Sequence, residues 1–120
     1  MKRDNLDQAA RPNDVIVKEF LDTIVKIVSE GSSYQYILMV LRKFMESHIE
    51  IFPFIKYLQI NSDGIAVDKK INSVDPQLIG KLLKVLVNTM FSDLFMHLVK
   101  KKLPKGLSKD LDNMGVSINS

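Results

Sequence analysis

Residues 54–71, FIKYLQINSDGIAVDKKI, decide the fold class of this chain. The first half, Phe54 to Ile60, is rich in aromatic and branched residues, and Ile65 to Asp68 alternates more weakly. Asp63-Gly64 lies between these runs and is the kind of pair that supplies the positive φ angles of a tight reversal. The stretch therefore predicts a β-hairpin, two short strands joined by a polar turn.

The same stretch contains Asn-x-Asp-Gly, which is also the centre of a calcium-binding loop. Such a loop needs an oxygen ligand at its first position and a bidentate carboxylate at its twelfth. If Gly64 takes the sixth position, Gln59 falls at the first and Lys70 at the twelfth. A cation cannot replace the carboxylate, so we interpret these residues as a turn and not as a calcium site.

Two helices are expected before the hairpin. The first begins at Asn13 or Asp14, which can cap it, and ends near Glu30, with an apolar stripe at helical spacing. The second is capped by Ser32 or Ser33 and runs to about residue 48. Its apolar side includes Ile37, Leu38, Val40, Leu41, Phe44, Met45 and Ile49.

A long helix is expected after the hairpin. Asp75-Pro76 is a clear helix start, because an N-cap acceptor precedes a proline at the first helical position. The apolar pattern continues to about Lys102 and covers most of the helix circumference. A helix of that kind is either central to its own fold or buried against a second subunit. We therefore predict a homodimer through helix 76–102, with these interface residues: Leu83, Val87, Met90, Phe91 and Leu94.

Together these elements predict an α+β fold, mostly helical. It consists of two N-terminal helices, a β-hairpin, a long central helix and a short C-terminal helix capped by Ser108. Residues 1–12 are polar and lack a period, so we expect a flexible N-terminal tail. Residues 13–120 are long enough for a single α+β domain with its own core.

Composition favours a cytoplasmic protein. The chain has 120 residues and no cysteine, and its N-terminus lacks the apolar segment of a signal peptide. The most apolar stretch, 82–99, is interrupted by Lys84, Asn88, Asp93 and His97, so we expect no membrane span.

No catalytic motif is visible, and we expect no enzyme activity and no cofactor. A serine nucleophile elbow and a phosphate-binding glycine loop are both missing from the sequence. The two histidines, His48 and His97, lack the spacing of a metal site, so we predict no bound metal. A hydrogen-bonded or solvated histidine near a helix end is the expected role of each.

Charge is distributed unevenly along the chain. Residues 81–109 hold seven lysines and one aspartate, a net charge of +6, whereas the whole chain carries +3. Five of these lysines form a C-terminal cluster that could contact an anion, a nucleic acid or an acidic protein: Lys100, Lys101, Lys102, Lys105 and Lys109. The simpler interpretation is that cations offset the dipole at a helix C-terminus.

Three functional hypotheses follow. The first is a non-enzymatic protein-interaction or regulatory module that forms a homodimer. The second is a nucleic-acid-binding regulator that uses the lysine cluster. A hairpin followed by a long apolar helix is loosely similar to winged-helix regulators that dimerise through a C-terminal helix, although that fold needs three helices before the hairpin and two are expected here. The third is a sensor domain for a small apolar ligand.

Overall fold

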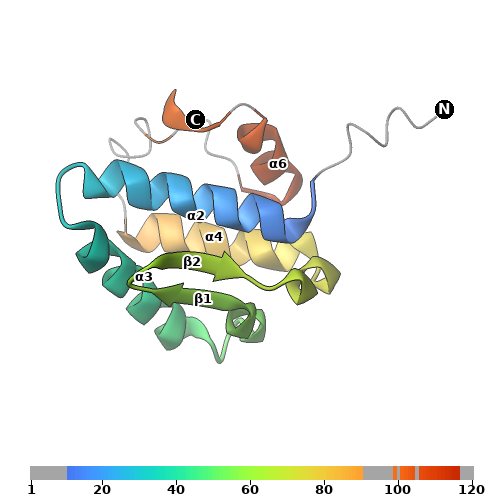
Figure 1. The fold of residues 1–120 in the computed structure, drawn as a ribbon. Helices are drawn as coiled ribbons and strands as arrows, with labels where there is room; N and C mark the ends of the chain where they lie inside the picture. The colour runs from blue at the N-terminus through green and yellow to red at the C-terminus, as the bar shows by residue number, and fades with distance from the viewer. Residues whose placement is uncertain (1–10, 91–98, 100, 105, 117–120) are drawn as a thin grey trace.

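Figure 1 shows the computed structural model of the protein, which describes residues 11–90, 99, 101–104 and 106–116. Helices precede and follow a single β-hairpin, so the predicted α+β, mostly helical fold is confirmed. In chain order they are α2 (Asn13–Ser29), α3 (Tyr34–His48), the 3-10 helix η1 (Pro53–Tyr57), β1 (Leu58–Asn61), β2 (Gly64–Val67), the 3-10 helix η2 (Lys69–Ser73), α4 (Pro76–Met90) and α6 (Leu107–Asn113).

Helix α2 begins one residue away from the predicted cap. The N-cap is Pro12, whose carbonyl oxygen accepts hydrogen bonds from the N–H groups of Val15 and Ile16. Asn13 is the first helical residue, and its side chain turns inward, with its Nδ2 donating to the carbonyl oxygens of Ile71 and Val74 at 3.0 and 2.9 Å. The prediction that Asn13 or Asp14 caps this helix was therefore wrong, because Asn13 bonds to the η2 turn instead.

The start of α3 follows the prediction more closely. Ser33 is its N-cap, and the hydroxyl oxygen accepts a hydrogen bond from the N–H of Tyr36 at 3.3 Å. Beyond its C-terminus, Pro53 occupies the first turn of η1, where its missing N–H costs nothing.

The hairpin is shorter than predicted. Residues 54–57 belong to η1, whose turn buries the neighbouring Phe54 and Ile55 together, whereas a strand would have placed them on opposite faces. In the antiparallel register, Leu58 lies opposite Val67 and Asn61 opposite Gly64. The turn is thus Ser62-Asp63, not Asp63-Gly64.

One face of the hairpin is buried. Ile60 and its cross-strand partner Ile65 are buried, whereas Gln59 and Ala66 on the other face are exposed. Helix α2 lies against β2 and α3 against β1, so the two N-terminal helices cover the apolar side of the two strands. Two strands are only marginally stable on their own, and packing against these helices stabilises the hairpin.

Asp75 and Pro76 start α4 as predicted. The carboxylate Oδ1 of Asp75 accepts a hydrogen bond from the N–H of Gln77 at 2.9 Å. The helix buries Ile79, Leu82, Leu83 and Leu86 in the core and is described as far as Met90. The predicted continuation towards residue 102 passes through residues 91–98 and 100, which lie outside the described residues.

Helix α6 closes the fold on the side of α2 opposite the hairpin (Figure 1). Leu107 and Leu111 are fully buried there, and α6 contacts both α2 and α4. Across the described residues, no helix is both long and apolar enough to cross a membrane.

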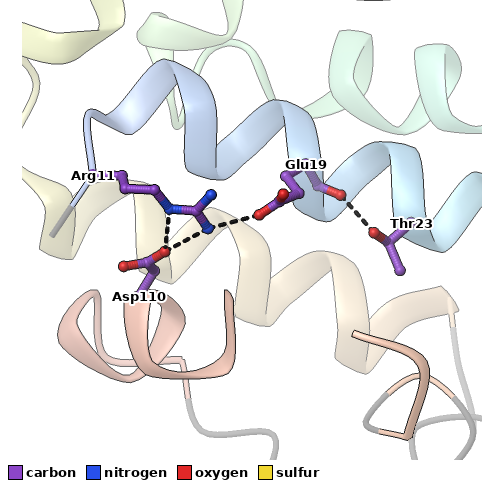
Figure 2. A network of polar contacts seen from close by, with 4 residues as sticks. All are labelled: Arg11, Glu19, Thr23 and Asp110. Atoms are coloured by element: carbon purple, nitrogen blue, oxygen red, sulfur yellow. Dashed lines mark hydrogen bonds and ion pairs between the residues drawn. The ribbon is translucent and has the colours of Figure 1, made fainter. Parts of the chain in front are cut away.

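Arg11 ties the start of α2 to α6, although the sequence places this residue in the tail (Figure 2). Its Nε donates to Oδ2 of Asp110 at 2.8 Å, and its Nη2 donates to Oε1 of Glu19 at 2.6 Å. These hydrogen bonds, first to Glu19 and then to Asp110, raise the pKa of Arg11 above its ordinary value. Residues 1–10 lie outside the described residues.

Candidate functional site

The predicted dimer interface divides into three groups. Leu83 is fully buried in the core of the single chain. Val87 and Met90 are half-buried against that core and keep part of their surface exposed. Phe91 and Leu94 lie outside the described residues.

The predicted lysine cluster is described in part. Lys101, Lys102 and Lys109 are exposed, whereas Lys100 and Lys105 lie outside the described residues. The Nζ of Lys102 lies 3.3 Å from Oε1 of Glu30, the C-cap residue of α2, and forms an ion pair with it.

Asn61 of the calcium-loop-like stretch and His48 form hydrogen bonds with nearby residues. The Oδ1 of Asn61 accepts a hydrogen bond from the N–H of Asp63 at 2.9 Å, which closes the hairpin turn. The Nδ1 of His48 lies 2.8 Å from the carbonyl oxygen of Phe44, and the two rings stack with centroids 4.1 Å apart. In the part of the chain that the structure describes, no three acidic, histidine or cysteine side chains gather as metal ligands would.

A concave feature lies between α3 and the hairpin, and we call it the α3–hairpin groove. Its volume is about 360 Å³, within the range of ligand-binding clefts. One wall is the C-terminal half of α3, another is η1, and the third is β1. Its apolar lining comes from all three elements: Met45, Ile49, Ile55, Leu58 and Ile60.

Three charged side chains line the same groove. Arg42 and Glu46 stand one helical turn apart on α3, with Nε of Arg42 3.2 Å from Oε2 of Glu46. Both are more than half exposed, so this ion pair contributes little to stability and either partner is free to turn to a ligand. Lys56 of η1 also lines the groove, and its Nζ lies 5.3 Å from the ring centroid of Tyr57.

A smaller hollow of about 140 Å³ extends the groove towards the hairpin tip. The two hollows share Arg42, Ile60 and Asn61, and together they follow α3 from Gln35 to Ile49. At about 1.5 Å of rise per residue, that length of helix is about 21 Å. The feature is therefore elongated, which suits a chain segment better than a compact small molecule.

Apolar side chains stand exposed at the end of this groove. Ile49, which lines it, is 40% exposed, and Ile51 in the following turn is 69% exposed. Met39, which lines the smaller hollow, is 46% exposed. Exposed apolar residues beside a hollow with a charged rim are typical of an interaction surface.

Sequence reasoning missed this groove because its walls come from different parts of the chain. Ile49 was counted with the apolar side of α3, and residues 54–57 were expected to be strand. The available signal was that two short strands are marginally stable alone and must pack on helices or pair with the edge of another chain. A groove with apolar walls, a charged rim and a strand at its edge can hold an extended or helical peptide. Comparison with protein-family models, with curated proteins and with solved structures found no match to this chain.

Proposed function

We propose that this chain is a non-enzymatic protein-interaction module that holds a segment of a partner protein in the α3–hairpin groove. The observation that carries the proposal is the elongated groove with Ile49 and Met39 exposed along it. Burial of apolar surface supplies most of the free energy of protein association, at about 25 cal/mol per Å². Side chains that are already exposed beside a hollow are the ones that a partner can cover.

The charged rim supports a protein partner in particular. Arg42, Glu46 and Lys56 surround an apolar floor, and protein interfaces share this arrangement of an apolar centre and a polar rim. Rim charges act mainly on association rate and on the choice of partner.

Self-association through α4 is a second form that the same function can take. Leu78 on the first turn of α4 is 44% exposed, and Val87 and Met90 are half-buried. Within the described part of this helix, Pro76–Met90, four apolar side chains turn into the core: Ile79, Leu82, Leu83 and Leu86.

The proposal is tested by selecting binders for the full chain from a phage-displayed library of random linear peptides. Selected peptides are then titrated against the wild type, Ile49→Gln and the control Val15→Gln. Ile49 and Val15 are matched, at 40% and 41% exposed, but Val15 lies on α2 outside the α3–hairpin groove.

We expect Ile49→Gln to weaken binding about tenfold. Burial of the exposed part of the isoleucine side chain by a partner contributes about 1.4 kcal/mol to the binding free energy. Val15→Gln should leave the affinity unchanged. If no selected peptide distinguishes Ile49→Gln from Val15→Gln, the groove is not a binding site and the proposal is wrong.

A further inference from the structure

We infer, building on the proposed function, that the partner binds as an extended segment that adds a third strand to the outer edge of β1. The segment would carry apolar side chains at alternate positions and an acidic residue that meets Arg42 and Lys56. Three observations support this inference: the unpaired backbone groups of β1, the way the groove encloses that edge, and the charge of its lining.

The hydrogen-bond pattern of the hairpin identifies which backbone groups are free. The N–H of Asp68 donates to the carbonyl oxygen of Tyr57 at 2.8 Å, so this pair is a hydrogen-bonded one. In an antiparallel ladder such pairs alternate with pairs that exchange no hydrogen bonds. Leu58 and Ile60 are therefore non-bonded positions, and their backbone groups point away from β2.

One of these four backbone groups is already used. The N–H of Leu58 donates to the carbonyl oxygen of Ile55 at the end of η1. The carbonyl of Leu58 and both backbone groups of Ile60 remain. Within the described residues none of these three has a hydrogen-bond partner in the protein. A strand of either direction could form three hydrogen bonds with them.

The unpaired edge opens into the α3–hairpin groove. Successive residues of a strand face opposite sides of the sheet, so Leu58 and Ile60 lie on one face and Gln59 and Asn61 on the other. All four line the groove, which means that it follows the edge of β1 and not only one face. Ile49 of α3 and Ile55 of η1 lie on the walls that flank this edge. An added strand would thus form backbone hydrogen bonds along the edge of β1 and place alternate side chains against the apolar wall on one face of the extended sheet.

Charge favours an acidic partner over a second copy of this chain. The groove is lined by two cations, Arg42 and Lys56, and one anion, Glu46, a net charge of +1. A second copy paired edge to edge would bring its own Arg42 and Lys56 to the same place, and like charges that face each other are destabilising. An aspartate or glutamate on an extended peptide would instead pair with these cations.

The test uses a peptide selected from the random library by the full-length protein, as above, whose binding requires Ile49. Each backbone nitrogen of the peptide is methylated in turn, and the affinity of each product is measured. We expect losses of about tenfold at every second position, because only alternate N–H groups of an added strand face β1. Methylation at the positions between them should have little effect.

Two further readouts locate the contact. In the ¹⁵N-labelled protein, the amide proton of Ile60 should exchange more slowly when the peptide is bound, while the amide of Leu58, already bonded to Ile55, should change less. Arg42→Gln should weaken binding about fivefold, as one partly exposed ion pair would. The matched control is Lys43→Gln, since Lys43 is exposed on the same helix but does not line the groove.

The possible outcomes separate this inference from the proposed function. If peptides bind through Ile49 but methylation weakens binding at consecutive positions and the Ile60 amide is unaffected, strand addition is wrong although the groove still binds proteins. If Arg42→Gln and Lys43→Gln behave alike, the acidic partner is wrong. If the unlabelled protein itself displaces the peptide and sediments as a dimer, the occupant is a second copy and the inference is overturned.

Discussion

Gly80 of α4 packs directly against the backbone of Met114, the residue that follows α6. A Cβ placed on Gly80 would overlap the carbonyl oxygen of Met114, and Gly80 itself is buried. Backbone can move out of the way far less easily than the end of a flexible side chain. Because Gly80 has no side chain, the end of α6 can approach α4 this closely, and no larger residue fits at this position.

Gly80→Ala is therefore expected to destabilise the protein by about 3 kcal/mol, even though alanine is the better helix former. The comparison is Gly31→Ala, because a Cβ at Gly31 would meet nothing within 4 Å and its φ is not positive. Urea unfolding followed by circular dichroism measures both variants. Equal stability of the two would contradict the close approach of α4 and α6.

Substitutions of Arg11 and Asp110 should have coupled effects on the free energy of unfolding. Asp110 has a side chain only 10% exposed, so Arg11→Gln leaves a nearly buried carboxylate with a neutral partner and should cost about 2 kcal/mol. Asp110→Asn combined with Arg11→Gln should cost less than the sum of the single changes, with a coupling of about 1 kcal/mol.

The control for that double-mutant cycle is the exposed pair Lys18 and Asp22, joined by a 2.7 Å contact with side chains 50% and 47% exposed. Lys18→Gln and Asp22→Asn should couple by less than about 0.5 kcal/mol. Chemical denaturation at neutral pH gives all the required free energies. Similar coupling in the two cycles would mean that Arg11 does not fasten α2 to α6.

Asn13→Asp should destabilise the fold in a pH-dependent way. The amide of Asn13 donates to two carbonyl oxygens, and a carboxylate would place negative charge against both, at a cost of about 3 kcal/mol at neutral pH. The folded state would raise the pKa of the introduced carboxyl above about 3.9, its unfolded value. The cost should be smaller below that pH, where the protonated carboxyl can donate to one of the two carbonyl oxygens, and should grow as the pH rises until it levels off above the raised pKa.

Asn72→Asp is the matched control, because there the Oδ1 of Asn72 accepts a hydrogen bond, from the N–H of Asp14 at 2.8 Å. A carboxylate keeps that acceptor near the start of α2, so its effect should stay within about 0.5 kcal/mol. Thermal unfolding at acidic and neutral pH compares the two variants. A loss for Asn13→Asp that does not change with pH would show that the amide is not a buried donor.

Self-association through α4 predicts a dimer at micromolar concentration in analytical ultracentrifugation. Val87→Glu should convert it to monomer, because the half-buried face of Val87 would carry a charge into the interface. Thr89→Glu, at an exposed neighbouring position of α4, should leave the dimer intact. A wild-type protein that sediments only as a monomer would rule out this form of the function.

The lysine cluster predicts affinity for nucleic acid that falls steeply with added salt. Lys101→Glu with Lys102→Glu should reduce that affinity at least about tenfold, as removing two phosphate contacts would. Lys69→Glu with Lys70→Glu is the matched control, since it reverses two adjacent exposed lysines on η2. Fluorescence anisotropy with duplex and single-stranded probes at ~50 mM salt decides the matter, and no binding by the wild type would end this hypothesis.

The order and type of the elements followed from local signals. Ser33 starts α3 and Asp75-Pro76 starts α4 as predicted, because capping depends on side chains within three residues of the helix end. The hairpin was predicted for the same reason, and the rejection of a calcium loop needed only the identity of Lys70.

Local signals did not correctly place side chains that bond to, or pack against, elements distant in the sequence. Asn13 was expected to cap α2, but it donates to η2 from 58 and 61 residues away in the sequence. Phe54 and Ile55 were expected in a strand, but both enter the core from η1. In each case burial against a distant element outweighed the local preference.

The sequence by itself determined the α+β class, the order of the helices and hairpin, and the residues that start α3 and α4. These depend on hydrogen bonds and periodicity within a few residues, and neighbours in the chain are enough to specify them. Only the tertiary structure decided that Leu83 lies in the core, that Ile49 stays exposed, and that the edge of β1 opens into a groove beside α3. Those facts depend on which surfaces meet after the chain folds back on itself, and an apolar residue looks the same in the sequence whether its partner is the core or another protein.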